Sequence, residues 1–172
     1  MPPDTRNALF WATARGHTDV VKLLLERGAN VNQTFQYGET VTAKAASDGN
    51  IPILQLLTEH GAILNNDPSA HGPIFYWSPL GLAAIHGKAE AIRFLLVHGT
   101  DPNFAAKKGA MIEDTPLMWA TLKGYPSCVQ LLIEYGADVN YQSPRGATAL
   151  KWARRIPSKV IEKMLLDAGA KH

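Results

Sequence analysis

Lysine, aspartate and histidine can all transfer protons in enzymes. One of each occurs in two similar segments of this chain: Lys44 and Asp48 in ETVTAKAASDG, and His86 in SPLGLAAIHGK. Lys44 lies among small and apolar residues in the stretch ETVTAKAASDG, and Asp48 follows it by four residues. A lysine in a water-poor site can have a lowered pKa and act as a base or an imine-forming nucleophile. His86 could then shuttle protons, and Asp48 could orient either group.

A structural role competes with this catalytic interpretation. Lys44 and Asp48 are spaced to form an (i, i+4) ion pair on one helix, worth about 0.2–0.5 kcal/mol. The carboxylate is C-terminal to the lysine, which is the weaker orientation, so helix stability alone explains the pair poorly. We nevertheless favour the structural role, because ion pairs that serve only structure also perturb titration.

The composition excludes several other kinds of reactive or metal-binding site. The single cysteine, Cys128, rules out an internal disulfide and a multi-cysteine zinc site, and we expect it to be buried and inert. The six histidines show no metal-ligand spacing, and no phosphate loop or nucleophile elbow is present. We therefore expect no metal and no cofactor.

The charge and hydropathy of the chain limit which partners and which cellular locations we expect. The net charge is only +2 and no basic run is present, so we expect no nucleic-acid binding. No apolar run approaches the roughly 18 residues of a membrane span, and MPPDTRNALFWA lacks the apolar core of a signal peptide. These features predict a soluble monomer of a reducing compartment, the cytoplasm, with the nucleus as the alternative.

Internal repeats determine how these residues are positioned. The text LLLERGANVN returns as LLTEHGAILN, LLVHGTDPN, LLIEYGADVN and, truncated, LLDAGAKH. The glycines of these runs are Gly28, Gly61, Gly99, Gly136 and Gly169, separated by 33, 38, 37 and 33 residues. A second related segment, such as SPLGLAAIHGK or TPLMWATLKGY, precedes each run. Two separations equal one period of 33 residues and the other two exceed it by five and four, and such a period is typical of a repeat protein.

Local physics predicts two helices in each repeat. Ser78 and Thr115 are good N-caps, and the prolines that follow them suit the first helical position. The second segment carries apolar residues at helical spacing and ends at a glycine such as Gly28, which can adopt the left-handed conformation that stops a helix.

The stretch TPLMWATLKGYPSCVQLLIEYGADVN resembles the ankyrin repeat, a 33-residue unit that opens with T-P-L-H-x-A. The resemblance covers one domain, 1–172, in five units of about 5–37, 38–75, 76–112, 113–145 and 146–172. It implies an all-α solenoid of helix–turn–helix units with projecting hairpin-like loops. The motif histidine is absent, so its usual hydrogen bond to the turn should be missing. The residues at its position are Phe10, Ala43, Gly81, Met118 and Lys151.

The family's concave groove is lined by the first helices and the loops, so helical spacing assigns residues to it. One series precedes the first alanine of each unit, and the second lies four residues further on. The first series is Trp11, Lys44, Leu82, Trp119 and Trp152, and the second is Arg15, Asp48, His86, Lys123 and Ile156. We add Tyr141 to the candidate binding residues and expect Lys44, Asp48 and His86 to lie near the middle of the groove.

Two insertions and the two ends depart from the repeat. The insertions fall in the loops around 66–77 and 104–114, where extra length serves recognition or reflects neutral drift. The first insertion supplies four further candidates for binding: His71, Phe75, Tyr76 and Trp77. At the ends, we expect a polar outer surface on the last unit and exposure of Phe10 or Trp11 on the first.

The most favoured function is therefore non-enzymatic recognition of a partner protein or peptide through the groove and loops. The alternative is a small-molecule-binding or catalytic ankyrin protein whose aromatic groove is centred on Lys44, Asp48 and His86. A third interpretation makes the chain the ankyrin module of a longer protein. An open groove favours a macromolecule, whereas a closed pocket of roughly 300–1,000 Å³ under the 66–77 loop favours a small molecule.

Overall fold

The computed structural model describes residues 7–35, 38–65, 78–105, 114–157 and 159–171, which form ten α-helices. In chain order they are α1 (Ala8–Ala14), α2 (Thr18–Glu26), α3 (Val41–Asp48), α4 (Ile51–Glu59), α5 (Pro79–Ile85), α6 (Ala89–Val97), α7 (Pro116–Lys123), α8 (Pro126–Glu134), α9 (Ala149–Ala153) and α10 (Lys159–Asp167). Among these residues the only β-bridge is an isolated antiparallel one between Thr34 and Thr40. None of the described helices is long and apolar enough to cross a membrane.

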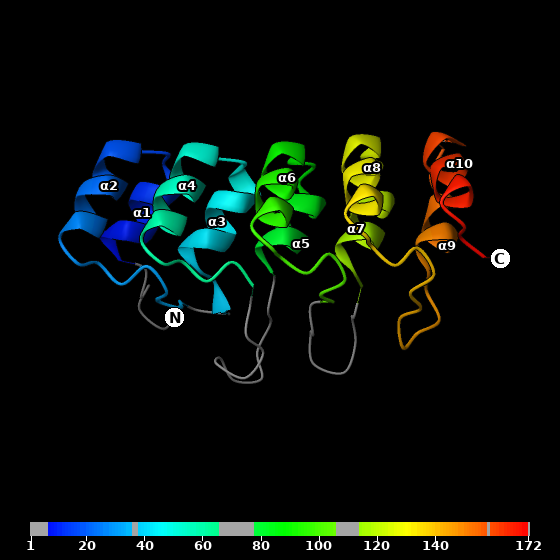
Figure 1. The fold of residues 1–172 in the computed structure, drawn as a ribbon, viewed down its shortest axis with the longest axis horizontal. Coiled ribbons are helices and arrows are strands. Elements are labelled where there is room, and N and C mark those ends of the chain that lie inside the picture. Colours follow the sequence, from blue (N-terminus) through cyan, green and yellow to red (C-terminus); the bar gives the residue numbers. More distant parts are fainter. Residues whose placement is uncertain (1–6, 36–37, 66–77, 106–113, 158, 172) are drawn as a thin grey trace, which may run out of the picture.

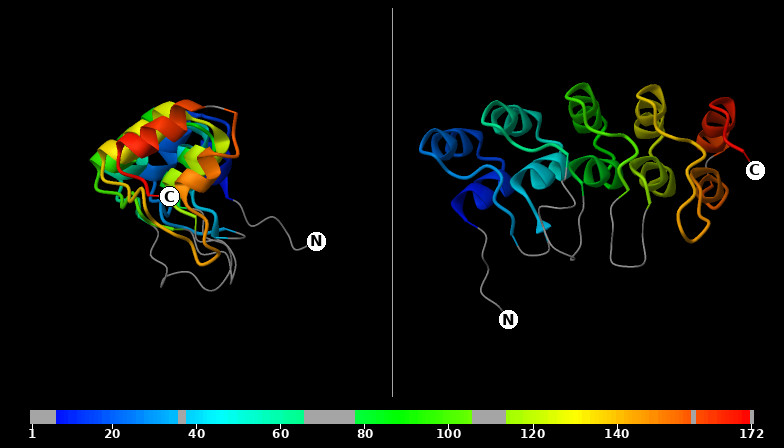
Figure 2. Two further views of the ribbon diagram at one scale, coloured as in Figure 1. Left: turned by 90° about the vertical axis from the view of Figure 1, so that its right-hand side faces the viewer. Right: turned by 60° about the horizontal axis from the view of Figure 1, so that its bottom comes forward.

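The helices form five helix–turn–helix pairs stacked side by side (Figure 1). Contacts between successive pairs join α1, α3, α5, α7 and α9 into one layer, which we call the first-helix layer. Helices α2, α4, α6, α8 and α10 form the second-helix layer (Figure 2). The described parts of the loops between pairs lie along one edge of the stack, the lower edge in Figure 1. This arrangement confirms the predicted all-α solenoid.

Side-chain caps start the helices of the first layer. The N-caps are Asn7, Thr40, Ser78, Thr115 and Thr148. Each cap oxygen accepts a hydrogen bond from the backbone N–H three residues further on, which satisfies a donor that the helix itself leaves unpaired. Pro79 and Pro116 follow two of these caps in the first turn, as predicted.

Glycines end the helices of the second layer as the repeats predict. The φ angles of Gly28, Gly61, Gly99, Gly136 and Gly169 are 82°, 79°, 81°, 85° and 90°. A residue with a side chain is strained at such angles. Gly87 is required for a second reason, since a Cβ there would lie 2.9 Å from the ring of Tyr125 in the next unit.

The hydrophobic core runs continuously between the two layers. Leu54, Leu80, Leu95 and Leu132 are fully buried members of it, and they come from four different helices. Small alanines such as Ala120 are also fully buried where neighbouring helices of the first layer pack. Each unit therefore buries its apolar surface against its neighbours, as expected of a solenoid.

Asparagine side chains link each unit to the next. The amide of Asn32 donates to the Gly61 carbonyl at 3.0 Å, and its oxygen accepts from the Ile63 N–H at 2.8 Å. The same two-way bridge recurs from Asn65, Asn103 and Asn140 to the following unit. Each bridge satisfies two backbone groups outside the helices, which would otherwise need water.

The position of the family's motif histidine is filled in two ways. In the first four units the side chains there are buried and apolar or absent: Phe10, Ala43, Gly81 and Met118. In the last unit Lys151 donates from Nζ to the Gly146 carbonyl at 2.6 Å, so a lysine makes a bond to its own turn.

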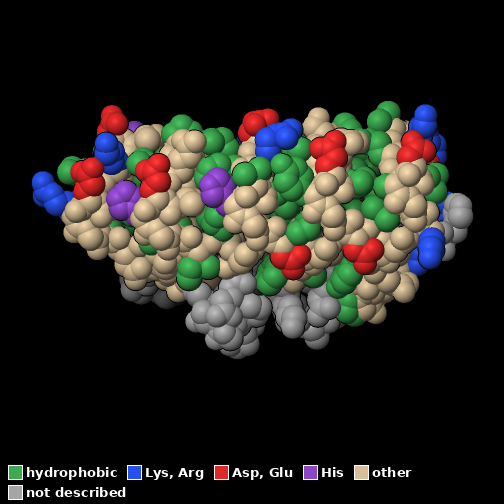
Figure 3. Space-filling model, in the orientation of Figure 1, with side chains coloured by type: hydrophobic (Ala, Val, Ile, Leu, Met, Phe, Trp, Pro, Cys, Tyr) green, Lys and Arg blue, Asp and Glu red, His purple; other side chains and the backbone are tan. Residues whose placement is uncertain are grey.

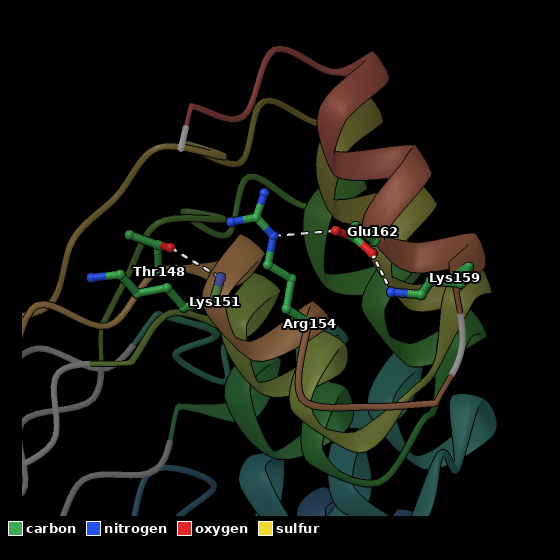
Figure 4. Close-up of polar contacts among 5 residues, drawn as sticks. All are labelled: Thr148, Lys151, Arg154, Lys159 and Glu162. Carbon is green, nitrogen blue, oxygen red and sulfur yellow. Dashed lines mark hydrogen bonds and ion pairs between the residues drawn. The ribbon is translucent and has the colours of Figure 1, made fainter.

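The two ends of the stack differ in polarity. In the last unit, Arg154 at the C-terminal end of α9 reaches across to Glu162 of α10, which also pairs with Lys159 (Figure 4). Lys163 is exposed beside them, so the predicted polar surface of this unit is present. In the first unit Trp11 is 43% exposed, whereas Phe10 is buried against Phe35 with ring centroids 5.1 Å apart.

Candidate functional site

Both predicted series lie on one face of the first-helix layer. In the first series Trp11 is exposed, and Lys44, Leu82 and the two later tryptophans are partly buried. The alanine that follows each of them is buried, so the two neighbouring positions point in opposite directions. In the second series Arg15, Asp48, His86 and Lys123 are exposed and Ile156 is partly buried. The helical spacing thus predicted correctly which side chains face outward.

A cavity of about 550 Å³ lies on this face, between α1, α3, α5 and the loop that precedes α3. Its apolar walls include Phe10, Trp11 and Leu82, and its polar groups include Arg15 and Lys44. His86, Ser47, Glu39, Thr40, Gly38, Ala14 and Ala43 complete the lining. Five residues of the predicted series therefore meet around one hollow, which we call the groove cavity.

The three polar candidates for catalysis form two separate interactions. Lys44 Nζ pairs with Asp48 Oδ1 at 2.7 Å, the (i, i+4) pair that the sequence allows. His86 Nδ1 lies 2.9 Å from the Leu82 carbonyl and 3.3 Å from the Ser47 hydroxyl. A carbonyl can only accept, so this contact places the hydrogen on Nδ1. Lys44 and His86 share the groove cavity, whereas Asp48 does not line it.

Asp48 instead lines a second hollow of about 540 Å³ at the C-terminal end of α1. Arg15 lines both hollows, and Thr13, Gly49 and Pro52 form other parts of the second one. The Thr13 hydroxyl is buried there without a hydrogen-bond partner in the part of the chain that the structure describes. Arg15 and its neighbour Ala14 therefore lie between the two hollows.

The remaining candidates lie apart from the groove cavity. Trp119, Lys123 and Trp152 belong to α7 and α9, further along the same layer, and Arg155 packs over the Trp152 ring at 4.9 Å. Tyr141 is partly buried after α8. Four candidates fall outside the described residues, together with most of the two insertions: His71, Phe75, Tyr76 and Trp77.

Seven of the twelve residues that line the groove cavity lie outside the two predicted series, among them Ser47, Glu39 and Phe10. Ser47 lies three residues after Lys44 on α3, so helical spacing alone could have assigned it to the same face. Glu39 and Phe10 had no such signal. Glu39 depends on the path of a loop, and Phe10 contributes an edge while most of its ring is buried.

Outside the groove cavity, the side chains that could react or bind a metal include the acidic residues, the cysteine and the other histidines of the described residues. No group of three or more His, Cys, Asp or Glu side chains within that part of the chain could hold a metal ion. Burial raises the pKa of the Cys128 thiol to about 11, and the sulfur is enclosed in the core, as predicted. Other histidines serve helix ends: His60 and His98 hold their Nδ1 atoms 2.8 Å and 2.7 Å from the carbonyls of Leu56 and Phe94.

Comparison with known proteins agrees with this geometry. A family model described as ankyrin repeats (3 copies) matches residues 2–69, 62–143 and 80–172, nearly the whole chain. The chain is 35% identical over 105 residues to ankyrin repeat and SAM domain-containing protein 6 of Rattus norvegicus, which covers 60% of this chain and 11% of that protein.

Two further relatives show the same partial overlap. Probable E3 ubiquitin-protein ligase XBOS32 of Oryza sativa subsp. japonica is 33% identical over 98 residues, 56% of this chain and 19% of that protein. Ankyrin repeat, SAM and basic leucine zipper domain-containing protein 1 of Oryctolagus cuniculus is 34% identical over 113 residues, 63% of this chain and 23% of that protein. The chain thus matches between about a tenth and a quarter of the length of these relatives.

Proposed function

Because this chain belongs to the ankyrin repeat family, we propose that it is a binding module that holds a partner protein or peptide against its first-helix layer. Ankyrin repeats generally mediate contacts between proteins, and no catalytic activity follows from the fold. The fold therefore supports the class of function, and the partner must be inferred from the face itself.

The groove cavity is the observation that carries the proposal. A tryptophan, Trp11, is 43% exposed at its edge, and the partly buried Leu82 lines the cavity from α5. Arg15, Lys44 and Glu39 surround these apolar groups with charge. An aromatic anchor surrounded by polar groups is the composition of the energetic centre of a protein interface.

A small molecule is the second candidate, and the volume of the groove cavity favours it. About 550 Å³ lies within the roughly 300–1,000 Å³ of ordinary ligand pockets. Catalysis is supported less well than binding. The Lys44 ammonium is held by Asp48 at 2.7 Å, and His86 Nδ1 is held by a main-chain carbonyl, so the two groups do not act on one another.

Site-directed photo-crosslinking tests the proposal. A photoreactive amino acid at Ser47, inside the groove cavity, should crosslink to a discrete partner in cells that express the protein. The matched control places the same amino acid at Gln55, which is exposed on α4 of the second-helix layer. Equal crosslinking at both positions, or none at Ser47, would contradict recognition through the groove. A rise in melting temperature with a metabolite, lost in Leu82→Arg, would favour the small molecule instead.

A further inference from the structure

Charge is divided unequally between the two helical layers. With their capping residues, the helices of the first layer hold five cations and one carboxylate. The cations are Arg15, Lys44, Lys123, Lys151 and Arg154, and the carboxylate is Asp48. The helices of the second layer and their capping residues hold six cations and seven carboxylates. The first-helix layer is thus the basic side of the stack.

Figure 3 shows how charged side chains are distributed on the face of the stack that is seen in Figure 1. Acidic side chains are spread along its whole length, while the basic ones gather toward its two ends and at one place near the middle. A face of mixed charge attracts neither sign strongly, so a charged partner should be steered to the first-helix layer.

Two cations of the first-helix layer are available to a partner. Arg15 and Lys123 are exposed, and their side chains have no ion-pair or hydrogen-bond partner in the described part of the chain. The other three are engaged: Lys44 pairs with Asp48, Arg154 pairs with Glu162, and Lys151 donates to the Gly146 carbonyl. The one carboxylate of the layer is therefore already neutralised, whereas two of its cations are not.

Arg15 and Lys123 occupy the same place in the first and fourth units, so they lie on one row. Neighbouring helices pack about 8–10 Å apart, which puts the two cations roughly 24–30 Å from one another. An extended chain covers about 3.3 Å per residue, so about seven to nine residues span that distance. The groove cavity, with Trp11 and Leu82 in its walls, opens on this row beside Arg15.

We propose that the partner segment is an acidic peptide bound in extended conformation along the first-helix layer. Its carboxylates pair with Arg15 and Lys123, and an apolar side chain between them enters the groove cavity. This inference rests on the proposed function and names the chemistry of its partner. Charge pairs at the exposed rim contribute mainly steering and register, and the apolar anchor contributes most of the affinity.

A peptide fits this row better than a nucleic acid does. Glu39 lines the groove cavity beside this row, so a continuous line of phosphates would meet a carboxylate there. Nucleic-acid sites instead cluster several cations that neutralise successive phosphates. Widely spaced cations with an apolar hollow beside one of them suit separate carboxylates on a peptide.

Selection from a random twelve-residue display library against the purified full chain tests the inference. Enriched peptides should carry at least two Asp or Glu residues and one large apolar residue. The double variant Arg15→Glu/Lys123→Glu should bind them at least about tenfold more weakly, and added salt should weaken binding to the parent. The control Lys22→Glu/Arg93→Glu makes the same charge change on the second-helix layer and should bind as the parent does.

The possible outcomes separate the inference from the proposed function. Neutral or basic peptides that compete for the groove cavity would overturn the acidic partner and leave peptide recognition in place. Acidic peptides unaffected by the double variant would overturn the assignment to Arg15 and Lys123. Tighter binding of a labelled twelve-nucleotide RNA than of any selected peptide would overturn the inference in favour of nucleic acid. Failure to enrich any peptide would overturn it as well, while the crosslink at Ser47 tests the proposed function separately.

Discussion

At the scale of single residues, Lys44 is a charged residue at a position where the other four units have a large apolar side chain. Three other units place tryptophan there, and Lys44 is partly buried between Trp11 and Leu82 along the groove cavity. A lysine can lay its methylenes along apolar walls while its ammonium stays in water. The lysine therefore leaves space where a tryptophan would fill it, which favours a role in forming the cavity.

Lys44→Trp tests this interpretation because it restores the local pattern. We expect the melting temperature to stay the same or rise, since the lost ion pair is exposed and worth at most about 1 kcal/mol. Binding of the crosslinked partner should fall at least about tenfold as the indole fills the groove cavity. Lys44→Gln is the control, since it removes the charge and keeps a slender side chain. If the Lys44→Trp variant binds the partner as tightly as the parent does, Lys44 is only a solvated residue on the wall of the groove cavity.

Side-chain exposure and the Lys44–Asp48 pair within one helix followed from helical spacing, whereas the contact between units did not. The two series fix which residues share a face, because the period of the helix determines direction. The contact of His86 with Ser47 joins two units and depends on side-chain conformation, and the sequence carried no signal for it. The structure places Asp48 on Lys44 and Ser47 on His86.

At the scale of helices, close packing depends on small side chains in the first layer. Ala120 of α7 is fully buried, and α7 packs against both α5 and α9. Caps and stops were predictable here because each uses a residue type with a strong local preference: threonine or serine at the start and glycine at the end. The loop conformations were not, because insertions change loop length without leaving a repeating pattern.

Ala120→Leu should therefore destabilise the protein by about 1–3 kcal/mol through overpacking. The same substitution at Ala8, exposed in the first turn of α1, is the control and should change stability by less than about 0.5 kcal/mol. Chemical denaturation followed by circular dichroism measures both. Equal midpoints for the parent and Ala120→Leu would contradict tight stacking at α7.

The last helix pair provides a pH-dependent contact. Hydrogen bonds from Lys159 and then Arg154 lower the pKa of the Glu162 carboxyl below its usual 4.5 (Figure 4). A carboxyl whose folded pKa is lowered adds stability above the unfolded pKa, and this stability is lost as pH falls through the folded value. Glu162→Gln should thus lower the melting temperature at pH 7, and the difference from the parent should shrink below about pH 4.5.

Thermal melts from pH 7 to pH 3 check this expectation. Glu26→Gln is the control, because Glu26 is exposed on α2 and its carboxylate has no ion-pair partner among the described residues. A difference for Glu162→Gln that stays constant across the whole range would show that the carboxylate acts through packing and not through charge.

At the scale of the whole molecule, one register position behaves differently according to its place in the stack. Eight residues before the closing glycine stand Val20, Ile53, Ala91, Cys128 and Ile161. Four of them are at most 1% exposed, while Val20 is 46% exposed. The sequence predicted the shared register through its repeats. It did not predict the difference at Val20, because burial in a solenoid comes from the neighbouring unit and not from the residue itself.

The final prediction uses this difference. Ile53→Ala removes a fully buried side chain held between two units and should cost about 2–5 kcal/mol of unfolding free energy. Val20→Ala makes a similar truncation at the same register position and should cost less than about 0.5 kcal/mol, because nearly half of that side chain already contacts water. Urea unfolding of both variants against the parent gives the two values, and the slope of the transition shows whether the stack still unfolds as one unit. A cost at Val20 as large as that at Ile53 would mean that α2 is covered in solution, by another part of the chain or by a second copy, and that the first unit is not an open end.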